Sequence, residues 1–265
     1  MLLVADNLQI TRREIAQAIR HRNPGPLRSY VMALQEAGAQ AIDINTGPLG
    51  RYAAEEMSFC VKTVQDVSDL PLLLDTVNPV AMRAGLDANR KTAAINGISM
   101  EPTKLDTILP LAVEYNVDVV GFLLDGRSQM PRQLEDRLAL ALELFQRCRE
   151  AGLRSEQLVF DPVVAPLIWE DGLHRNRDLL EIIRRLPEIL DFPIRTAVGL
   201  SNLTTGQGAS LAKQQVEKIF LCMLASAGLS WVLMDIHRRE SVVTAHNCRL
   251  LLDASIFAWE AVEAG

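Results

Sequence analysis

The chain lacks several features that mark particular classes of protein. Its four cysteines include no Cys-x-x-Cys pair, so thiols buried in a reducing cytoplasm are predicted rather than disulfides. No apolar run approaches the roughly 18 residues of a membrane-spanning helix, and the N-terminal run is too short for a signal peptide. The net charge is −6, with both signs spread along the chain, which argues against a nucleic-acid partner. A cytoplasmic protein with no membrane partner is therefore expected.

The composition is that of an ordinary globular protein. Of the 265 residues, 49% are hydrophobic and 23% are charged, a balance typical of soluble domains. The length fits one large α/β barrel or two smaller domains. Because strands and helices alternate throughout, we expect residues 1–265 to form a single barrel domain.

Short apolar runs that end in Asp or Asn recur along the chain. In the clearest, at residues 71–78, three leucines lead into Asp75. A run with no polar alternation predicts a strand buried on both faces, as in a parallel sheet. An unpaired carboxylate is costly to bury, so Asp75 is expected at the carboxyl end of its strand. Strands are predicted at residues 2–5, 41–45, 71–76, 92–96, 117–125, 157–161, 194–202 and 231–235.

Helical patterns separate these strands, and the clearest has Leu134, Leu138 and Leu142 on one face. Helices are predicted at residues 12–21, 26–37, 53–67, 79–86, 103–115, 131–152, 177–186, 213–227 and 242–262. Ala-Gly pairs that predict helix ends stand at residues 37–38, 84–85, 151–152 and 227–228. Eight alternating strand–helix units predict an α/β protein with a (β/α)8 TIM barrel. An open doubly wound sheet would need a glycine-rich phosphate turn after the first strand, and ADNLQI at 5–10 is not one.

Polar side chains stand at the end of nearly every predicted strand. They are Asp6, Asp43, Asn45, Asp75, Asn96, Asp125, Asp161, Asn202 and Asp235. In a (β/α)8 barrel these ends converge on the face that carries the active site. Asp and Asn also cap helices, which would account for any one of them. Capping accounts less well for the whole set, because several of them precede the next helix by a long loop.

Other catalytic chemistry is poorly represented. The histidines His21, His174, His237 and His246 are scattered, so no metal site is expected. GLSN at 199–202 lacks the last glycine of a nucleophile elbow. No strand ends in lysine, which argues against a Schiff-base aldolase. Carboxylates and amides together can instead bind the N–H and C=O edge of a flat heterocycle, such as a pterin or guanine-like ring.

Five motifs stand in order at the predicted strand ends. They are DINTGP at 43–48, LDTVNP at 74–79, AIN at 94–96, FDP at 160–162 and GLSN at 199–202. Together they resemble the methyltetrahydrofolate:corrinoid/iron–sulfur protein methyltransferases, of the pterin-binding barrel superfamily that also holds dihydropteroate synthase. The resemblance implies a (β/α)8 barrel, usually a homodimer. It also implies an enzyme that moves the N5 methyl group between methyltetrahydrofolate and the cobalt of a corrinoid (cobalamin), which a separate partner protein carries. No metal bound by this chain is implied.

The resemblance also implies roles for individual residues. The family's pterin-binding aspartate, asparagine and aspartate fall on Asp75, Asn96 and Asp161, and its asparagine near N5 falls on Asn202. The further residues expected to line the pterin site are Asp6, Asp43, Asn45, Gly199 and Ser201. Tetrahydrofolate leaves poorly unless N5 is protonated or strongly hydrogen-bonded, so Asn202 is expected to stabilise that state without itself titrating. The corrinoid supplies the Co(I) nucleophile, which explains why no protein nucleophile is needed.

Three segments depart from the family pattern. ADNLQ at 5–9 stands where the family has Gly-Glu-Arg-Ile-Asn, the loop after Asn202 is a few residues longer and lacks the family's arginine–proline pair, and HRRE at 237–240 replaces an acidic run after Asp235. All three changes lie at the predicted mouth of the barrel, the face where the carboxyl ends of the strands converge, so they bear on the partner protein and on the folate tail. A non-catalytic pterin- or corrinoid-binding barrel is one alternative, which the altered opening motif would suit. A dihydropteroate synthase is another, although its Ser-, Arg- and Lys-rich loops are not visible.

Overall fold

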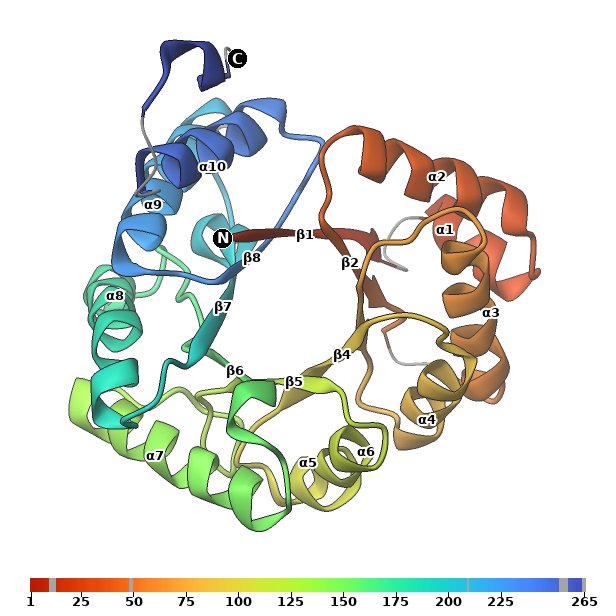
Figure 1. Ribbon diagram of the computed structural model, residues 1–265, viewed down its shortest axis with the longest axis horizontal. Helices are drawn as coiled ribbons and strands as arrows, with labels where there is room; N and C mark the ends of the chain where they lie inside the picture. The colour runs from red at the N-terminus through yellow and green to blue at the C-terminus, as the bar shows by residue number, and fades with distance from the viewer. Residues whose placement is uncertain (10–12, 48–49, 209, 253–256, 264–265) are drawn as a thin grey trace.

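The computed structural model describes residues 1–9, 13–47, 50–208, 210–252 and 257–263. Within these residues, eight parallel strands close a barrel in chain order, with a ring of helices around it (Figure 1). The strands are β1 (Leu2–Gln9), β2 (Ala41–Asn45), β3 (Leu72–Asp75), β4 (Ala93–Ile98), β5 (Asp118–Phe122), β6 (Leu158–Asp161), β7 (Arg195–Gly199) and β8 (Trp231–Met234). The predicted (β/α)8 barrel is therefore confirmed.

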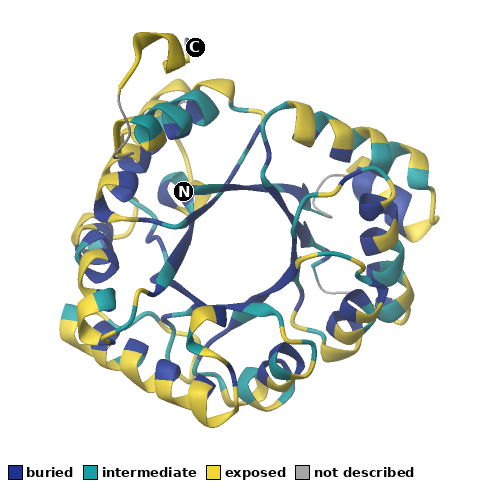
Figure 2. Cartoon of the chain, viewed as in Figure 1, coloured by how far each residue is buried: buried dark blue, intermediate teal, exposed yellow. Residues whose placement is uncertain are grey.

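The helices bury their inner faces against the strands and expose their outer faces (Figure 2). They are α1 (Arg13–Arg20), α2 (Pro24–Glu36), α3 (Ala53–Gln65), α4 (Pro79–Ala88), α5 (Pro102–Thr107), α6 (Leu109–Glu114), α7 (Leu134–Glu150), α8 (Gly172–Ile189), α9 (Ser210–Ala227) and α10 (Arg239–Leu252). The glycines that follow α2, α7 and α9 have positive φ angles, as predicted for helix ends. The side chain of Asn78 caps α4 by accepting from the N–H groups of Val80 and Ala81 at 3.0 and 3.2 Å.

Several predicted elements have different bounds. The strand predicted at 2–5 continues to Gln9 as β1, so Asp6 lies within the strand and not after it. The helix predicted at 103–115 is two helices, α5 and α6, that meet at Ile108. Pro110 has no N–H group and cannot continue the hydrogen bonding of α5. The strand predicted at 117–125 ends at Phe122, and the Asp125 carboxylate accepts from two backbone N–H groups of a turn. The strand predicted at 194–202 ends at Gly199, where a 3-10 helix, η2 (Leu200–Thr204), begins.

Other differences concern helices. The Ala-Gly pair at 84–85 was predicted to end a helix, but Gly85 lies inside α4. A Cβ on Gly85 would stand 2.8 Å from Met57 Cγ, so the glycine there serves close packing of α4 on α3. Helix α8 begins at Gly172 rather than 177. Instead of the helix predicted at 242–262, the structure has α10, whose described part ends at Leu252. Residues 253–256 of that prediction lie outside the described residues, and a short 3-10 helix, η3, spans Trp259–Ala261.

The cysteines divide into two groups. Cys60 and Cys148 are buried, as predicted. Cys222 is exposed and Cys248 is half-buried, so the prediction of buried thiols was wrong for this pair. Their Sγ atoms lie 3.6 Å apart, because α9 and α10 pack side by side.

Candidate functional site

The alternation of side chains along the strands builds the site. One residue from each strand fills the barrel interior, namely Val4, Ala41, Leu73, Ala94, Val120, Val159, Ala197 and Trp231. Side chains two positions further along a strand point to the same face. In β1, β2, β3, β4 and β6 the residues so placed are Asp6, Asp43, Asp75, Asn96 and Asp161. In β5, β7 and β8 they are Phe122, Gly199 and Leu233, so the mouth has a polar side and an apolar wall.

Four of the predicted binding residues lie together at the ends of β2, β3 and β4. Asp43 Oδ1 accepts from Asn96 Nδ2 at 3.1 Å. Asp75 Oδ2 accepts from Asn45 Nδ2 at 2.6 Å. Asp43 and Asn96 are buried, with 3% and 6% of their surfaces exposed. Each carboxylate therefore has one amide donor, which leaves other acceptor positions for a ligand.

The electrostatics of this group favour a ligand that donates hydrogen bonds. Burial raises the pKa of Asp43 well above its ordinary value, and repulsion from Asp75 adds to the rise, which the bond from Asn96 opposes. Burial raises the pKa of Asp75 to about 6, although Lys104 and the bond from Asn45 lower it. Buried carboxyl groups with too few donors are typical of binding sites. N–H groups of a ligand would supply the missing donors.

Asp161 lies at the end of β6, with 7% of its surface exposed. Its Oδ1 accepts from the N–H group of Val163 at 2.7 Å. Burial raises the pKa of Asp161 to about 7, against the lowering effects of Val163 and Arg137. Arg137, on α7, is fully buried and donates to the carbonyl oxygens of Pro162 and Arg175. A buried guanidinium group thus holds the start of the loop that follows Asp161.

The second half of β1 contacts the turn that follows β7. Ser201 Oγ donates to Asp6 Oδ2 at 3.2 Å. Burial raises the pKa of Asp6 to about 6; the bond from Ser201 lowers it and repulsion from Asp235 raises it. The next residue, Asn7, is buried and donates its amide to the carboxylate of Asp235. Two predicted site residues, Asp6 and Ser201, are therefore in contact at the mouth.

Asn202 was expected at the end of a strand, and it lies instead in η2, where it is exposed. Its side chain folds back over Gly199. Asn202 Nδ2 lies 3.1 Å from the point where a Cβ on Gly199 would stand. The amide of Asn202 therefore lies so close to Gly199 that a side chain at residue 199 would crowd it.

Two buried charged residues near the mouth were not predicted. Arg137 shares a helix face with the apolar residues Leu134, Leu138 and Ala141. Glu217 shares a face of α9 with Phe220, Leu221 and Leu224 in the same spacing of three, four and seven residues. A charge on the apolar stripe of a helix must have a buried partner. That spacing was the signal in the sequence that could have identified both residues.

The described part of the chain supports few other kinds of site. No group of three or more His, Cys, Asp or Glu side chains within it is arranged to hold a metal ion. Among the same residues, no helix is both long enough and apolar enough to cross a bilayer. The mouth presents carboxylates and amides against an apolar wall, an arrangement suited to a flat ring with several N–H donors.

Comparisons with known proteins point to one superfamily. The model of the pterin binding enzyme family matches residues 11–235. The methylcorrinoid:tetrahydrofolate methyltransferase of Eubacterium limosum is 24% identical over 244 residues, which are 91% of this chain and 87% of that protein. The methionine synthase of Mycobacterium tuberculosis is 23% identical over 204 residues, which are 72% of this chain but 16% of that protein.

Solved structures agree on the fold. A dihydropteroate synthase of Xanthomonas albilineans with 4-aminobenzoic acid superposes with a TM-score of 0.70 at 17% identity, covering 96% of this chain and 92% of that one. The same enzyme in complex with 7,8-dihydropteroate gives a TM-score of 0.66 at 18% identity, with 96% and 94% covered. At these identities the likeness establishes the barrel fold alone.

Proposed function

The chain belongs to the pterin-binding enzyme family, and from this premise we propose that it transfers the N5 methyl group between methyltetrahydrofolate and the cobalt of a corrinoid protein. Its similarity to a methylcorrinoid:tetrahydrofolate methyltransferase over most of both chains supports this reaction, and so does its similarity to part of methionine synthase. The observation that carries the proposal is the group of buried carboxylates and amides at the mouth, with Asn202 at its edge.

In this proposal the pterin ring lies across the ends of β2, β3, β4 and β6. Its amino and ring N–H groups donate to Asp75 and Asp161, and its carbonyl edge accepts from the amide of Asn96. Asp43 and Asn45 orient the groups that touch the ring, through the bonds at 3.1 and 2.6 Å. The ring thereby supplies hydrogen-bond donors to the carboxylates in addition to those of the protein, so that ligand binding relieves the cost of their burial.

Asn202 supplies the catalytic hydrogen bond in this proposal. When the methyl group leaves, N5 must not depart as an amide anion, so it needs a proton or a strong hydrogen bond. A carboxamide can stabilise that developing N–H character at any physiological pH, because it does not titrate. The place of its Nδ2 above Gly199, at the edge of the mouth, supports this role.

A separate corrinoid protein supplies Co(I) or methyl-cobalt as the second substrate, and it must cover the mouth to reach N5. Apolar side chains are exposed in the segments that leave β3 and β6 at this end of the barrel. Val77 and Ile168 have 70% and 65% of their surfaces exposed, and Trp169 has 47%. Exposed apolar groups around a polar site are typical of a docking surface. We therefore assign the partner to this rim.

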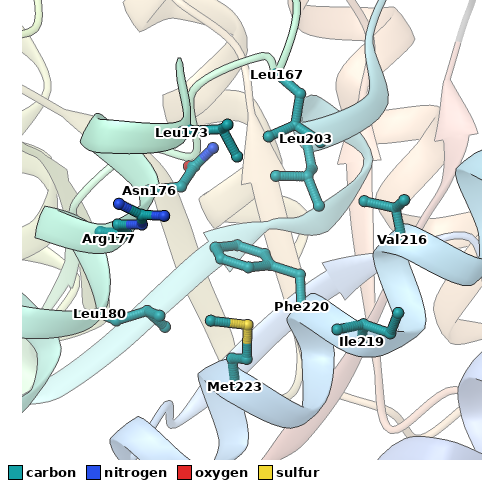
Figure 3. A pocket seen from close by; sticks show the side chains of 10 residues that line it. All are labelled: Leu167, Leu173, Asn176, Arg177, Leu180, Leu203, Val216, Ile219, Phe220 and Met223. Carbon is teal, nitrogen blue, oxygen red and sulfur yellow. The ribbon is translucent and has the colours of Figure 1, made fainter. Parts of the chain in front are cut away.

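We also propose that the chain is a homodimer. An apolar hollow of about 320 Å³ lies between α8 and α9, on the outside of the barrel. Leu173 and Leu180 line it from α8, and Ile219, Phe220 and Met223 line it from α9 (Figure 3). Leu173 and Ile219 are 65% and 62% exposed. A second copy covering this face would remove these side chains from water.

One assay tests the reaction. The protein is mixed with methyltetrahydrofolate and free Co(I) cobalamin, and the loss of Co(I) absorbance is followed. Decay no faster than the uncatalysed rate, both with free cobalamin and with candidate corrinoid proteins, would reject the enzymatic proposal. Calorimetry with the folate alone then separates the alternatives. Binding without turnover would support a non-catalytic pterin-binding barrel, and the absence of binding would assign the polar group at the mouth to the scaffold.

A further inference from the structure

A buried carboxylate stands behind the turn that carries Asn202. Glu217, on the inner face of α9, has 2% of its surface exposed. One of its oxygens accepts from the hydroxyl group of Thr204, the last residue of η2. The other accepts from the guanidinium group of Arg238, in the segment after β8. The turn that carries Asn202 is therefore bonded to two other parts of the chain through one side chain.

The same network continues to the first strand. Arg238 Nε lies 3.5 Å from Asp235 Oδ2, and the other oxygen of Asp235 accepts from the amide of Asn7. Asn7 Oδ1 in turn accepts from the N–H group of Ile236 at 2.9 Å. The bonds therefore join four elements: the second half of β1, the turn η2, helix α9 and the segment after β8. The opening segment and HRRE at 237–240, which both depart from the family pattern, are parts of one network.

Stability alone is a poor reason for such a network. Replacing a buried ion pair by apolar groups of similar volume is often neutral or stabilising. The surroundings of Glu217 on α9 are otherwise apolar, so the helix could pack without it. The ion pair and the hydroxyl bond are directional, so they fix the positions of Thr204 and Arg238 relative to the two oxygens of Glu217.

We propose that Glu217 and Arg238 are positioning residues that hold Thr204, and with it the turn of Asn202, at a fixed height above the mouth. Neither residue touches the pterin. The inference rests on the proposed function, since it is the Asn202 amide that must meet N5. Thr204 is two residues from Asn202, so a change in its anchoring moves the amide directly. A displacement of about 1 Å is enough to slow an enzyme strongly.

Kinetics test the role. In Glu217→Gln and Thr204→Val, kcat for methyl transfer is expected to fall about 10- to 100-fold, while the Kd for methyltetrahydrofolate changes less than about twofold. The contacts assigned to the ring, at Asp75, Asn96 and Asp161, remain intact in both variants. Thr204→Ser keeps the hydroxyl group and is expected to retain near wild-type kcat. A loss of folate affinity with kcat unchanged, or a Thr204→Ser variant as slow as Thr204→Val, would overturn the inference.

Hydrogen exchange read by mass spectrometry tests the anchoring without the reaction. Residues 200–206 are expected to exchange faster in Glu217→Gln and Thr204→Val than in the wild type. Glu240→Gln is the matched control, because it removes an exposed carboxylate close to Arg238 that pairs with Lys218 instead. Unchanged exchange of residues 200–206 in both variants would overturn the inference, whether or not the wild type is active. Faster exchange together with an inactive wild type would reject the methyl transfer and keep the network as the anchor of the turn.

Discussion

Asn96 Nδ2 and Asp43 Oδ1 lie 3.1 Å apart although β4 and β2 are not neighbours in the barrel. Strand β3 separates them, and Asp75 at its end is bonded to Asn45 on β2. The bond can form because both side chains point into the barrel from the same side of their strands, each two residues after a residue of the interior cluster. The two carboxyl groups are close enough that repulsion from Asp75 adds to the rise in the pKa of Asp43 that burial causes. A ligand with N–H donors would offset the cost of ionisation, which leads to the following predictions.

Removal of the Asp75 carboxylate is expected to weaken folate binding. In Asp75→Ala the ring donors that it accepts would be left unpaired, and the Kd measured by calorimetry should rise about 10- to 100-fold. Asp125→Ala is a suitable control, because Asp125 also follows a strand but is half-buried and, among the described residues, its carboxylate bonds to its own turn. Equal affinities for Asp75→Ala and the wild type would show that the pterin site is assigned wrongly.

Asn202→Ala is expected to slow methyl transfer about 10- to 1000-fold, the effect of losing one preorganised donor. The rate of Co(I) loss at saturating folate measures it. Asn78→Ala is the matched control: it removes the cap of α4, costs about 1 kcal/mol of stability and leaves the rate unchanged. If Asn202→Ala were as fast as this control, the hydrogen bond to N5 would come from another group.

A methyl group at residue 199 is expected to disturb Asn202 without disturbing the fold. Gly199 has a φ of −85°, which alanine adopts freely, but the added Cβ would press on Asn202 Nδ2 at 3.1 Å. We expect kcat to fall roughly 3- to 30-fold in Gly199→Ala, with an unchanged melting temperature. Gly50→Ala adds its Cβ in open space and serves as the control. Wild-type kcat in Gly199→Ala would mean that the amide has room to move.

In the absence of folate, the stability of the protein is expected to depend on the ionisation of Asp161. Its pKa is about 7 in the folded protein and near 3.8 when unfolded, so its contribution is fully present below pH 3.8 and is lost as the pH rises through 7. Asp161→Asn does not ionise. As the pH is raised from 4 to 8, the free energy of unfolding of the variant should therefore increase by about 2–4 kcal/mol relative to that of the wild type. Denaturant unfolding at both pH values measures the gain, and a constant difference would contradict the raised pKa.

A charge in the hollow between α8 and α9 is expected to break the dimer. Ile219→Glu places a carboxylate among apolar side chains that a second copy would cover. Light scattering coupled to gel filtration should report one chain for the variant and two for the wild type. Leu142→Glu changes an exposed leucine of α7 elsewhere on the surface and should leave the dimer intact. A monomeric wild type would reject the homodimer outright.

Much of the architecture followed from local patterns in the sequence. Leucine runs without polar alternation predicted strands such as β3, because a strand in a barrel is buried on both faces. The period of apolar residues predicted α7. A polar residue at the end of most strands predicted where the mouth lies. An unpaired carboxylate is costly to bury, so it is expected where a strand emerges from the core. These are properties of neighbouring residues, so the sequence by itself determined them.

The contacts between distant residues were decided only by the tertiary structure. Asn202 was predicted to end a strand but lies in η2, where its amide has room because Gly199 has no side chain. Glu217 and Arg238 meet only because α9 packs beside the segment after β8. Asp125 was predicted to lie at a strand end on the active-site face. Because β5 ends three residues before it, its carboxylate instead accepts a hydrogen bond from a local turn. Local propensity sets which residues form a strand or a helix, whereas the closure of the barrel sets which of their ends meet.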